Sequence, residues 1–354
     1  MMTKTRFLKF AVATVMISTV LIVGALLGLD LWYHKRFEKV AGMNWRGYRG
    51  PVVHRKLPGE QRVAVLGGST AFCFGVSGAE AWPAALERSV NAQRRARHQG
   101  PVSIVNLGAL HVGAYSFTDT LRDYASLDYD VALFYTGYND LGAPNIRNIR
   151  RESPLFRLTG YYPILPLVVK EKLMALRYGG NLEAAYLAEQ GKRPTFRPNY
   201  TQVQSSEGAQ AVAAVKKALL EFPEEDLVVH GDLSRALGAV NAQQVQLAAE
   251  GCGDLWAFYC WSLERAVSVA LDDGKTVMVV TQPYLSPRHI QQQQVMTRRL
   301  QERWKDDPRI QYVNVGQTAD LRDPALCFDG IHLTVQGNQR IAEALVDPLL
   351  QRLD

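Results

Sequence analysis

The chain has 354 residues, of which 47% are hydrophobic and 21% are charged. This balance is typical of a globular protein with a sizeable core, although the length alone fits either one large domain or two smaller ones. The formal net charge is +6, but the basic residues are scattered along the chain. Because the sequence has no basic helix with interleaved aromatic residues, it argues against a nucleic-acid-binding protein.

The first predicted element is a membrane-spanning helix. Residues Phe10 to Leu29 carry no charge and are numerous enough to cross a bilayer core of about 30 Å at about 1.5 Å per residue. Trp32 and Tyr33 follow, where an aromatic belt is expected. A cleaved signal peptide is the alternative, but no A-x-A-like cleavage site precedes Asp30. We therefore expect residues 1–40 to form an uncleaved anchor.

The charges on the two sides of this span indicate its orientation. Lys4, Arg6 and Lys9 have no acidic neighbours, whereas the basic residues after the span are diluted by Asp30 and Glu38. Basic residues favour the cytoplasmic side of a membrane. We therefore expect a cytoplasmic N-terminus and a body on the exported (periplasmic or extracytoplasmic) side.

The four cysteines are an even number, which is compatible with an oxidising compartment. Cys252 and Cys260 are near enough in sequence to close a local loop. Cys73 and Cys327 lie near two parts of the site predicted below, so they form a second candidate pair. Buried reduced thiols are the alternative, and the sequence leaves both open.

After a juxtamembrane linker at 41–60, predicted strands and helices alternate. Short apolar runs rich in β-branched residues and bounded by turns are typical of buried parallel strands, and they occur at 62–66, 102–106, 130–135, 275–281 and 310–315. Helices are predicted at 83–97, 256–271 and 334–350, the first with Pro83 in its opening turn, where a missing N–H costs nothing. This alternation predicts an α/β fold whose parallel sheet is covered on both faces.

The stretch at about 141–255 interrupts the alternation. It contains helix-like runs at 209–221 and 236–250 but no clear strand pattern. We therefore expect one domain, 61–354, with a helical insertion at about 141–255. Within it, residues 161–178 mix apolar and basic side chains, which fits either a packed cap helix or a helix lying on a membrane surface.

Candidates for chemistry follow the predicted strands, because ligands of an open α/β sheet bind at the carboxyl ends of the strands. Ser69 follows Gly67-Gly68 after the first strand, in a turn that can present its hydroxyl beside backbone N–H groups. Asn139 follows the third strand and can donate its amide to an oxyanion, although an Asx turn explains it equally. Gly108 and Gly113 follow the second strand, and each can offer a backbone N–H.

The decisive motif is Asp329-Gly330-Ile331-His332, just before the last helix. A carboxylate three residues before an imidazole can orient the ring for proton transfer, and a helix-capping Asp beside an unrelated His is the alternative. Among the seven histidines, His111 is the rival base because it lies near the end of the second strand. His289 is expected to begin a surface helix.

Together these motifs resemble the four blocks of the SGNH/GDSL hydrolase family, in the family's order. The blocks are VLGGST with Ser69, NLGALHVGAYS with Gly113, GYND with Asn139, and DGIH with Asp329 and His332. The resemblance covers about 61–140 and 256–350. In the second block, Gly113 matches the family's oxyanion glycine better than Gly108. One departure is Gly68, where the family usually has aspartate.

The resemblance implies a flavodoxin-like three-layer sandwich with a parallel five-stranded sheet. It also implies a serine-dependent carboxylic ester hydrolase, with Ser69, His332 and Asp329 as the catalytic triad and with Gly113 and Asn139 in the oxyanion hole. No metal or cofactor is needed. The expected substrate is an ester on an exported or membrane-proximal glycan or lipid. An O-acyltransferase for an exported polysaccharide and a catalytically inactive polysaccharide-binding scaffold remain as alternatives.

Overall fold

The centre of the molecule is a sheet of five parallel strands in the order β2-β1-β3-β4-β5. The structure is a computed structural model that describes residues 4–38, 42–142, 144–177, 179 and 242–353. Its strands are β1 (Gln61–Gly67), β2 (Val102–Asn106), β3 (Val131–Tyr135), β4 (Thr276–Val280) and β5 (Ile310–Val313). Each coincides with one of the expected runs, and the order is that of a flavodoxin-like, doubly wound sheet. The predicted fold class is therefore confirmed.

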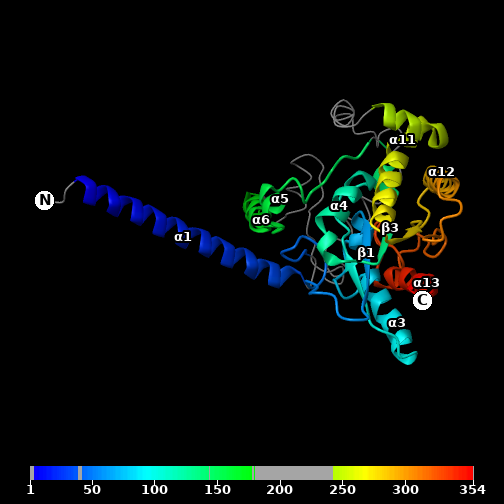
Figure 1. The fold of residues 1–354 in the computed structure, drawn as a ribbon, viewed down its shortest axis with the longest axis horizontal. Coiled ribbons are helices and arrows are strands. Elements are labelled where there is room, and N and C mark those ends of the chain that lie inside the picture. The colour runs from blue at the N-terminus through cyan, green and yellow to red at the C-terminus, as the bar shows by residue number, and fades with distance from the viewer. Residues whose placement is uncertain (1–3, 39–41, 143, 178, 180–241, 354) are drawn as a thin grey trace.

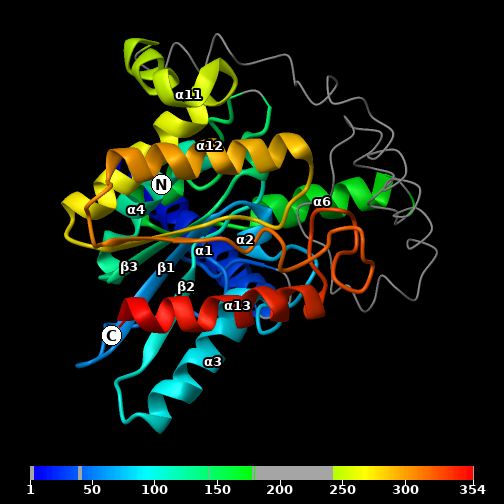
Figure 2. The ribbon, with the colours of Figure 1, turned by 90° about the vertical axis from the view of Figure 1, so that its right-hand side faces the viewer.

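Helices cover both faces of the sheet, as Figure 2 shows. Val63 and Val65 of β1 face one hydrophobic core, whereas Ala64 and Leu66 face the other, because successive side chains of a strand point to opposite faces. The first core includes residues of α3 (Trp82–Ala96) and α13 (Val335–Leu353), and the second includes residues of α4 (Phe117–Asp123), α11 (Ala242–Asp272) and α12 (Pro287–Arg303). Burial on both faces explains why the inner strands β1, β3 and β4 are almost continuously apolar.

Four short helical turns lie near the strands. Two of them follow β1 and β3, and the other two lie on either side of α4, between β2 and β3. The four turns are α2 (Ser69–Phe72), η1 (Ala114–Ser116), η2 (Ala125–Leu127) and η3 (Tyr138–Asp140). Two of them, α2 and η3, contain the serine and the asparagine selected from the sequence.

A long helix, α1 (Lys4–Phe37), extends away from the sheet domain (Figure 1). By length and composition it can cross a membrane, since its most apolar window has a mean hydropathy of 2.5 and is not buried in the molecule. The same properties fit a signal sequence at this position.

The segment expected as a juxtamembrane linker folds onto the domain. Tyr48 is fully buried, and its hydroxyl accepts a hydrogen bond from Val53 N–H at 2.8 Å. Arg49 is buried as well, and its backbone N–H donates to the carbonyl of Asn106, the last residue of β2, at 3.1 Å. Residues 42–60 therefore join α1 to the sheet through packed contacts.

Part of the expected insertion is described. It contains α5 (Pro154–Thr159), α6 (Leu165–Arg177) and the first turns of α11. The helix-like run at 209–221 lies outside the described residues. Of the run at 236–250, the structure describes residues 242–250, which are helical.

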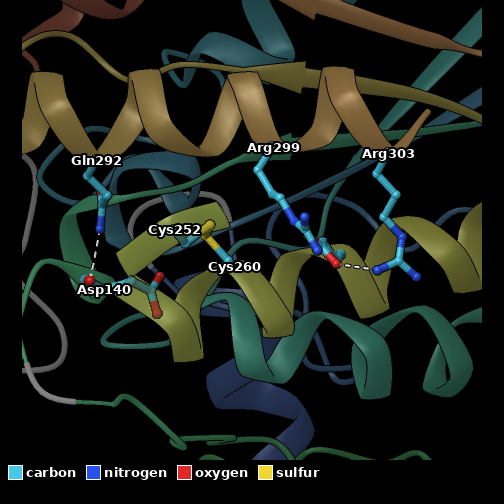
Figure 3. The surroundings of a disulfide bond; sticks show 7 residues. Asp140, Cys252, Cys260, Gln292, Arg299 and Arg303 are labelled. Carbon is cyan, nitrogen blue, oxygen red and sulfur yellow. Dashed lines mark hydrogen bonds and ion pairs between the residues drawn. A yellow bond between two sulfur atoms is a disulfide. The ribbon is translucent and has the colours of Figure 1, made fainter. Parts of the chain in front are cut away.

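A disulfide joins Cys252 to Cys260 across a break in α11, where Gly253 has φ +67° and ψ 162° (Figure 3). The second pairing considered from the sequence does not form, because Cys73 and Cys327 are buried thiols. Beside the disulfide, Arg299 of α12 binds Glu264 of α11 at 2.6 Å. The disulfide closes a loop within α11, and the ion pair ties α11 to α12 over one face of the sheet.

Candidate active site

The register of the two central strands places two predicted site segments side by side. Gly67, the last residue of β1, pairs with Tyr135, the last residue of β3. The strand order reverses direction between β1 and β3, and this switch point is where ligands bind in doubly wound sheets. The turns that follow these strands contain Ser69 and Asn139.

Two glycines allow the turn that contains Ser69 to lie against its neighbours. A Cβ atom at Gly67 would lie 2.3 Å from the Tyr135 carbonyl oxygen, and one at Gly68 would lie 2.1 Å from Asn139 Nδ2. A Cβ at Gly67 would therefore collide with the backbone of β3, whereas one at Gly68 would force the Asn139 amide to move. At Gly68, where the family that the sequence resembles usually has aspartate, a side chain would displace the Asn139 amide from its present place.

Ser69, His332 and Asp329 form a continuous hydrogen-bonded row. His332 Nε2 lies 2.8 Å from Ser69 Oγ, and His332 Nδ1 lies 2.7 Å from Asp329 Oδ2. His332 and Asp329 are buried, whereas Ser69 is partly exposed. The row therefore presents its hydroxyl end to solvent and shields its carboxylate end.

A tight turn brings the carboxylate and the imidazole together. Gly330 has φ +86°, a left-handed conformation that glycine adopts without steric cost. Asp329 Oδ1 accepts hydrogen bonds from the N–H groups of Ile331 at 3.0 Å and of His332 at 2.7 Å. Burial opposes ionisation of Asp329, but the neighbouring His332 and these hydrogen bonds outweigh it and hold the pKa of Asp329 well below its ordinary value.

Aromatic side chains flank the imidazole. The ring of Phe328 stacks on His332 with centroids 6.0 Å apart, and the ring of Phe74 lies 5.1 Å from it. A Cβ at Gly75 would lie 2.4 Å from the Phe328 ring, so this glycine allows the two aromatic segments to approach. Neither ring was among the residues expected at the site, although both are close in sequence to them.

The candidate oxyanion donors converge beside Ser69. Asn139 Nδ2 donates to the Val112 carbonyl at 2.8 Å, and its second amide hydrogen is available to another acceptor. The Gly108 N–H already donates to Asn106 Oδ1 at 3.0 Å. Within the described part of the chain, no hydrogen bond from the N–H of Ser69 or Gly113 is found. This difference favours Gly113 over Gly108 as a donor.

Asp140 holds the segment that contains Gly113. Its carboxylate accepts a hydrogen bond from Ala114 N–H at 3.1 Å, and a Cβ at Gly113 would lie 2.3 Å from Asp140 Oδ1. Burial raises the pKa of Asp140 to about 7, against the lowering effect of hydrogen bonds from Ala114 and Thr136. Glycine at 113 is therefore required for this buried contact.

Gln282 joins the turn that contains Ser69 to the turn that contains Asn139, which we call the asparagine turn. It follows β4 and is buried. Its Nε2 donates to Thr70 Oγ1 at 2.6 Å, and its Oε1 accepts a hydrogen bond from Tyr138 N–H at 2.8 Å. The residues bonded by this one side chain are direct neighbours of Ser69 and Asn139.

Arg49 binds the loop that follows Ser69. Its guanidinium donates to the carbonyls of Phe72 at 2.7 Å and Cys73 at 3.1 Å, and also to that of Val76. Burial lowers the pKa of Arg49 to about 10, a value at which the group remains charged near neutral pH. These bonds satisfy three carbonyls of the loop that follows the serine.

Two other histidines, His111 and His289, do not take the place of His332 beside Ser69. The rival base His111 is exposed, and it is His332 that contacts Ser69. A helix begins beside His289 as expected, but the side chain of His289 does not lie at the surface. His289 is fully buried in the first turn of α12, where its ring packs on Tyr138 with centroids 4.7 Å apart. Burial lowers the pKa of His289 to about 4.

The inner face of α12 is polar because it binds the asparagine turn. Gln292 Nε2 donates to the Asp140 carbonyl at 2.8 Å (Figure 3), and Gln293 Nε2 donates to the Thr136 carbonyl at 3.2 Å. Both side chains are buried.

Among the described residues, no group of three or more His, Cys, Asp or Glu side chains is arranged to hold a metal ion.

Comparison with known proteins finds matches among solved structures. No family model matches the chain, and no curated protein matches it. A putative lipolytic protein of the G-D-S-L family from Desulfitobacterium hafniense is 10% identical, with a TM-score of 0.38, over 81% of this chain and 98% of that one. A family 3 carbohydrate esterase from Clostridium thermocellum is 11% identical, with a TM-score of 0.40, over 83% and 100%. A lipase/acylhydrolase from Enterococcus faecalis is 12% identical, with a TM-score of 0.39, over 83% and 97%.

The chain resembles GDSL/SGNH lipolytic proteins and carbohydrate esterases. These are the proteins that its four sequence blocks also resemble. At such low identities and TM-scores, the likenesses assign no activity to this chain.

The role of Gln282 can be tested with Gln282→Met, which keeps the side-chain volume but removes both hydrogen bonds. We expect kcat for an ester substrate to fall about 10- to 100-fold, because a small misplacement of reacting groups is costly, whereas KM should change little. The matched control is Gln61→Met at the other end of β1, where the Gln61 amide donates to the Leu353 carbonyl. Unchanged kcat in Gln282→Met, or an equal fall in the control, would contradict the assignment.

The raised pKa of Asp140 predicts a pH-dependent stability. In the folded state the carboxyl group of Asp140 stays protonated up to about pH 7, whereas in the unfolded chain it loses its proton near the ordinary pKa of about 4. The stabilisation is therefore complete below pH 4 and is lost as the pH rises to 7.

The measurement is the urea concentration at the midpoint of unfolding, taken for the full chain in detergent between pH 4 and 7. In the wild type this midpoint should fall as Asp140 loses its proton, and Asp140→Asn should remove that contribution to the fall. The control Asp306→Asn, at an exposed position, should follow the wild type. Identical pH profiles for Asp140→Asn and the wild type would refute the prediction.

Proposed function

We propose that this chain is a serine-dependent carboxylic ester hydrolase with Ser69 as nucleophile. The observation that supports this most strongly is the row of hydrogen bonds from Asp329 through His332 to Ser69, with distances of 2.7 Å and 2.8 Å. A nucleophile, a base within hydrogen-bond reach and a group that orients the base are the parts that acyl transfer requires. A binding scaffold without catalytic activity needs no such arrangement.

In the proposed reaction, Ser69 Oγ attacks the ester carbonyl carbon while His332 Nε2 takes the hydroxyl proton. Because Nδ1 faces the ionised Asp329, the neutral ring carries its proton on Nδ1 and has its lone pair on Nε2. The protonated ring then gives its proton to the departing alcohol oxygen, and an acyl-serine remains. Water, deprotonated by the same Nε2, attacks the carbonyl carbon of this acyl-serine. The bond to Ser69 Oγ then breaks, the ring returns its proton to Ser69 Oγ, and the acid is released.

The negative charge on the carbonyl oxygen is stabilised by donors fixed before the substrate binds. The proposed donors are the N–H groups of Ser69 and Gly113 and the side-chain amide of Asn139. Donors aimed at the developing charge lower the barrier because they need no reorganisation during the reaction. Gln282 and Asp140 act as positioning residues, since each fixes the backbone beside one of these donors.

We further propose that α1 anchors the domain on the exported side of a membrane. Its length and hydropathy support a span, and the basic residues before it support a cytoplasmic N-terminus. The Cys252–Cys260 disulfide supports an oxidising compartment. The substrate would then be an ester on a glycan or lipid at or near the membrane surface.

The proposal is tested by steady-state kinetics on acetylated sugars and on esters of short and long acyl chains. Ser69→Ala should lower kcat by about 10⁴-fold or more, and Asn139→Ala by about 10²- to 10³-fold, the effect of one lost oxyanion donor. Ser126→Ala, which changes an exposed serine in η2, is the matched control and should turn over normally. Wild-type turnover by Ser69→Ala would contradict the proposal.

A further inference from the structure

Two helices of the insertion expose apolar side chains beside α1. We call this surface the α5–α6 face, and its members are Leu155, Leu158, Val169, Leu173 and Leu176. Leu158 and Leu176 are the most exposed, at 84% and 81%. Residues 169, 173 and 176 follow the spacing of one helix face. A cluster of exposed leucines on a soluble surface is costly and marks a contact with something apolar.

The start of α6 is bound directly to α1. Asp30 Oδ1 accepts a hydrogen bond from Ile164 N–H at 2.9 Å and another from Leu165 N–H, so a side chain of α1 caps the N-terminus of α6. The Tyr161 hydroxyl donates to the other carboxylate oxygen. His34, one turn further along α1, lies between the carbonyls of Met43 at 2.9 Å and Tyr162 at 2.8 Å.

This attachment fixes the level of α6 along α1. Asp30 immediately follows the uncharged stretch from Phe10 to Leu29, so α6 begins where an apolar span would leave the hydrocarbon core. Trp32 and Trp45 are partly exposed near the same level, at 51% and 40%, and Trp45 stacks on Tyr161. Aromatic residues at this position are typical of a membrane–water interface.

The direction of α6 fits a helix that lies in the plane of a membrane. In Figure 1 α1 extends across the picture while α6 is seen nearly end-on. In Figure 2, turned by 90°, α6 extends across the picture and α1 points along the view. The two helices therefore run across one another, and a bilayer crossed by α1 would be parallel to α6.

We propose that the α5–α6 face inserts into the boundary between headgroups and acyl chains of the bilayer that α1 crosses. This rests on the membrane anchor proposed above. The exposed Lys170 and Lys172 of α6 suit a leaflet that contains anionic lipids. Two attachments, a spanning helix and a surface helix joined rigidly through Asp30, hold the domain in one orientation and at one height. Ser69 then works at a fixed distance from the membrane.

Fluorescence depth measurement on the full chain tests the proposal. Single variants Leu158→Cys, Leu173→Cys, Val20→Cys and Arg322→Cys are labelled with an environment-sensitive dye and reconstituted into vesicles of phosphatidylcholine and phosphatidylglycerol. Val20 lies within α1, and Arg322 is a surface control with 89% of its side chain exposed. The unlabelled native chain shows whether the buried thiols react, and turnover of an ester shows that each labelled variant is folded.

We expect the labels at 158 and 173 to lie roughly 5–10 Å below the surface. Quenching by lipids with a doxyl group near the headgroup should exceed quenching by lipids with the doxyl deep in the chain by about twofold or more, as that depth implies. The label at 20 should be quenched most by the deep doxyl, and the label at 322 by neither. Vesicles without anionic lipid should weaken the signal at 158 and 173.

Two results would overturn the proposal. Labels at 158 and 173 that aqueous iodide quenches as strongly as the label at 322 would show that the face is in water. Labels shielded from iodide but not quenched by doxyl lipids would show that protein covers the face. If the label at 20 also fails to meet lipid, the anchor itself is wrong, whereas failure at 158 and 173 alone removes only this inference.

Discussion

The parallel pairing of β1 with β3 is the constraint on which the site depends. Because Gly67 pairs with Tyr135, the two strands end at the same level, and the turns after them must share one narrow space. A Cβ at Gly67 would collide with the backbone of β3, and a Cβ at Gly68 would displace the Asn139 amide. The same close approach brings the Asn139 amide against the turn that contains Ser69.

Other parts of the site are fixed relative to this pair of turns. Gln282 bonds to both turns, and the Asp140 carboxylate holds the segment of Gly113. His332 arrives from the far end of the chain, in a turn closed by its own aspartate. Buried polar groups of this kind are stable only when they are hydrogen-bonded, so each bond that positions the site also satisfies a group inside the protein.

Much of the fold could be predicted from the sequence because the strands are buried on both faces, which leaves continuous apolar runs. The Asp329 and His332 pair could be found because its contact is local. The role of Gln282 could not, since its partners are 212 and 144 residues away and no periodicity marks such a contact. His289 was expected at the surface, yet it is buried against the ring of Tyr138. The neighbouring Gln292 and Gln293 are buried because the carbonyls of Asp140 and Thr136 accept their hydrogen bonds.

The contacts of Asp30 also could not be predicted from the sequence, because its hydrogen-bond partners are distant along the chain. In the sequence it is only the first charge after an apolar stretch, whereas in the structure it caps α6 and connects the two parts that we propose meet the membrane. A flexible linker would let the domain turn freely. The buried Tyr48 and the contacts of Asp30 and His34 instead hold α1 and the domain together.

The claim that Ser69 is an activated nucleophile is tested most directly by a fluorophosphonate, which phosphonylates serine only where a base and oxyanion donors assist the attack. The folded full-length chain would be treated, digested and mapped by mass spectrometry. We expect one adduct per chain, on the peptide that contains Ser69, and none after prior unfolding. An unmodified Ser69 in folded protein, or an adduct on another serine, would contradict it.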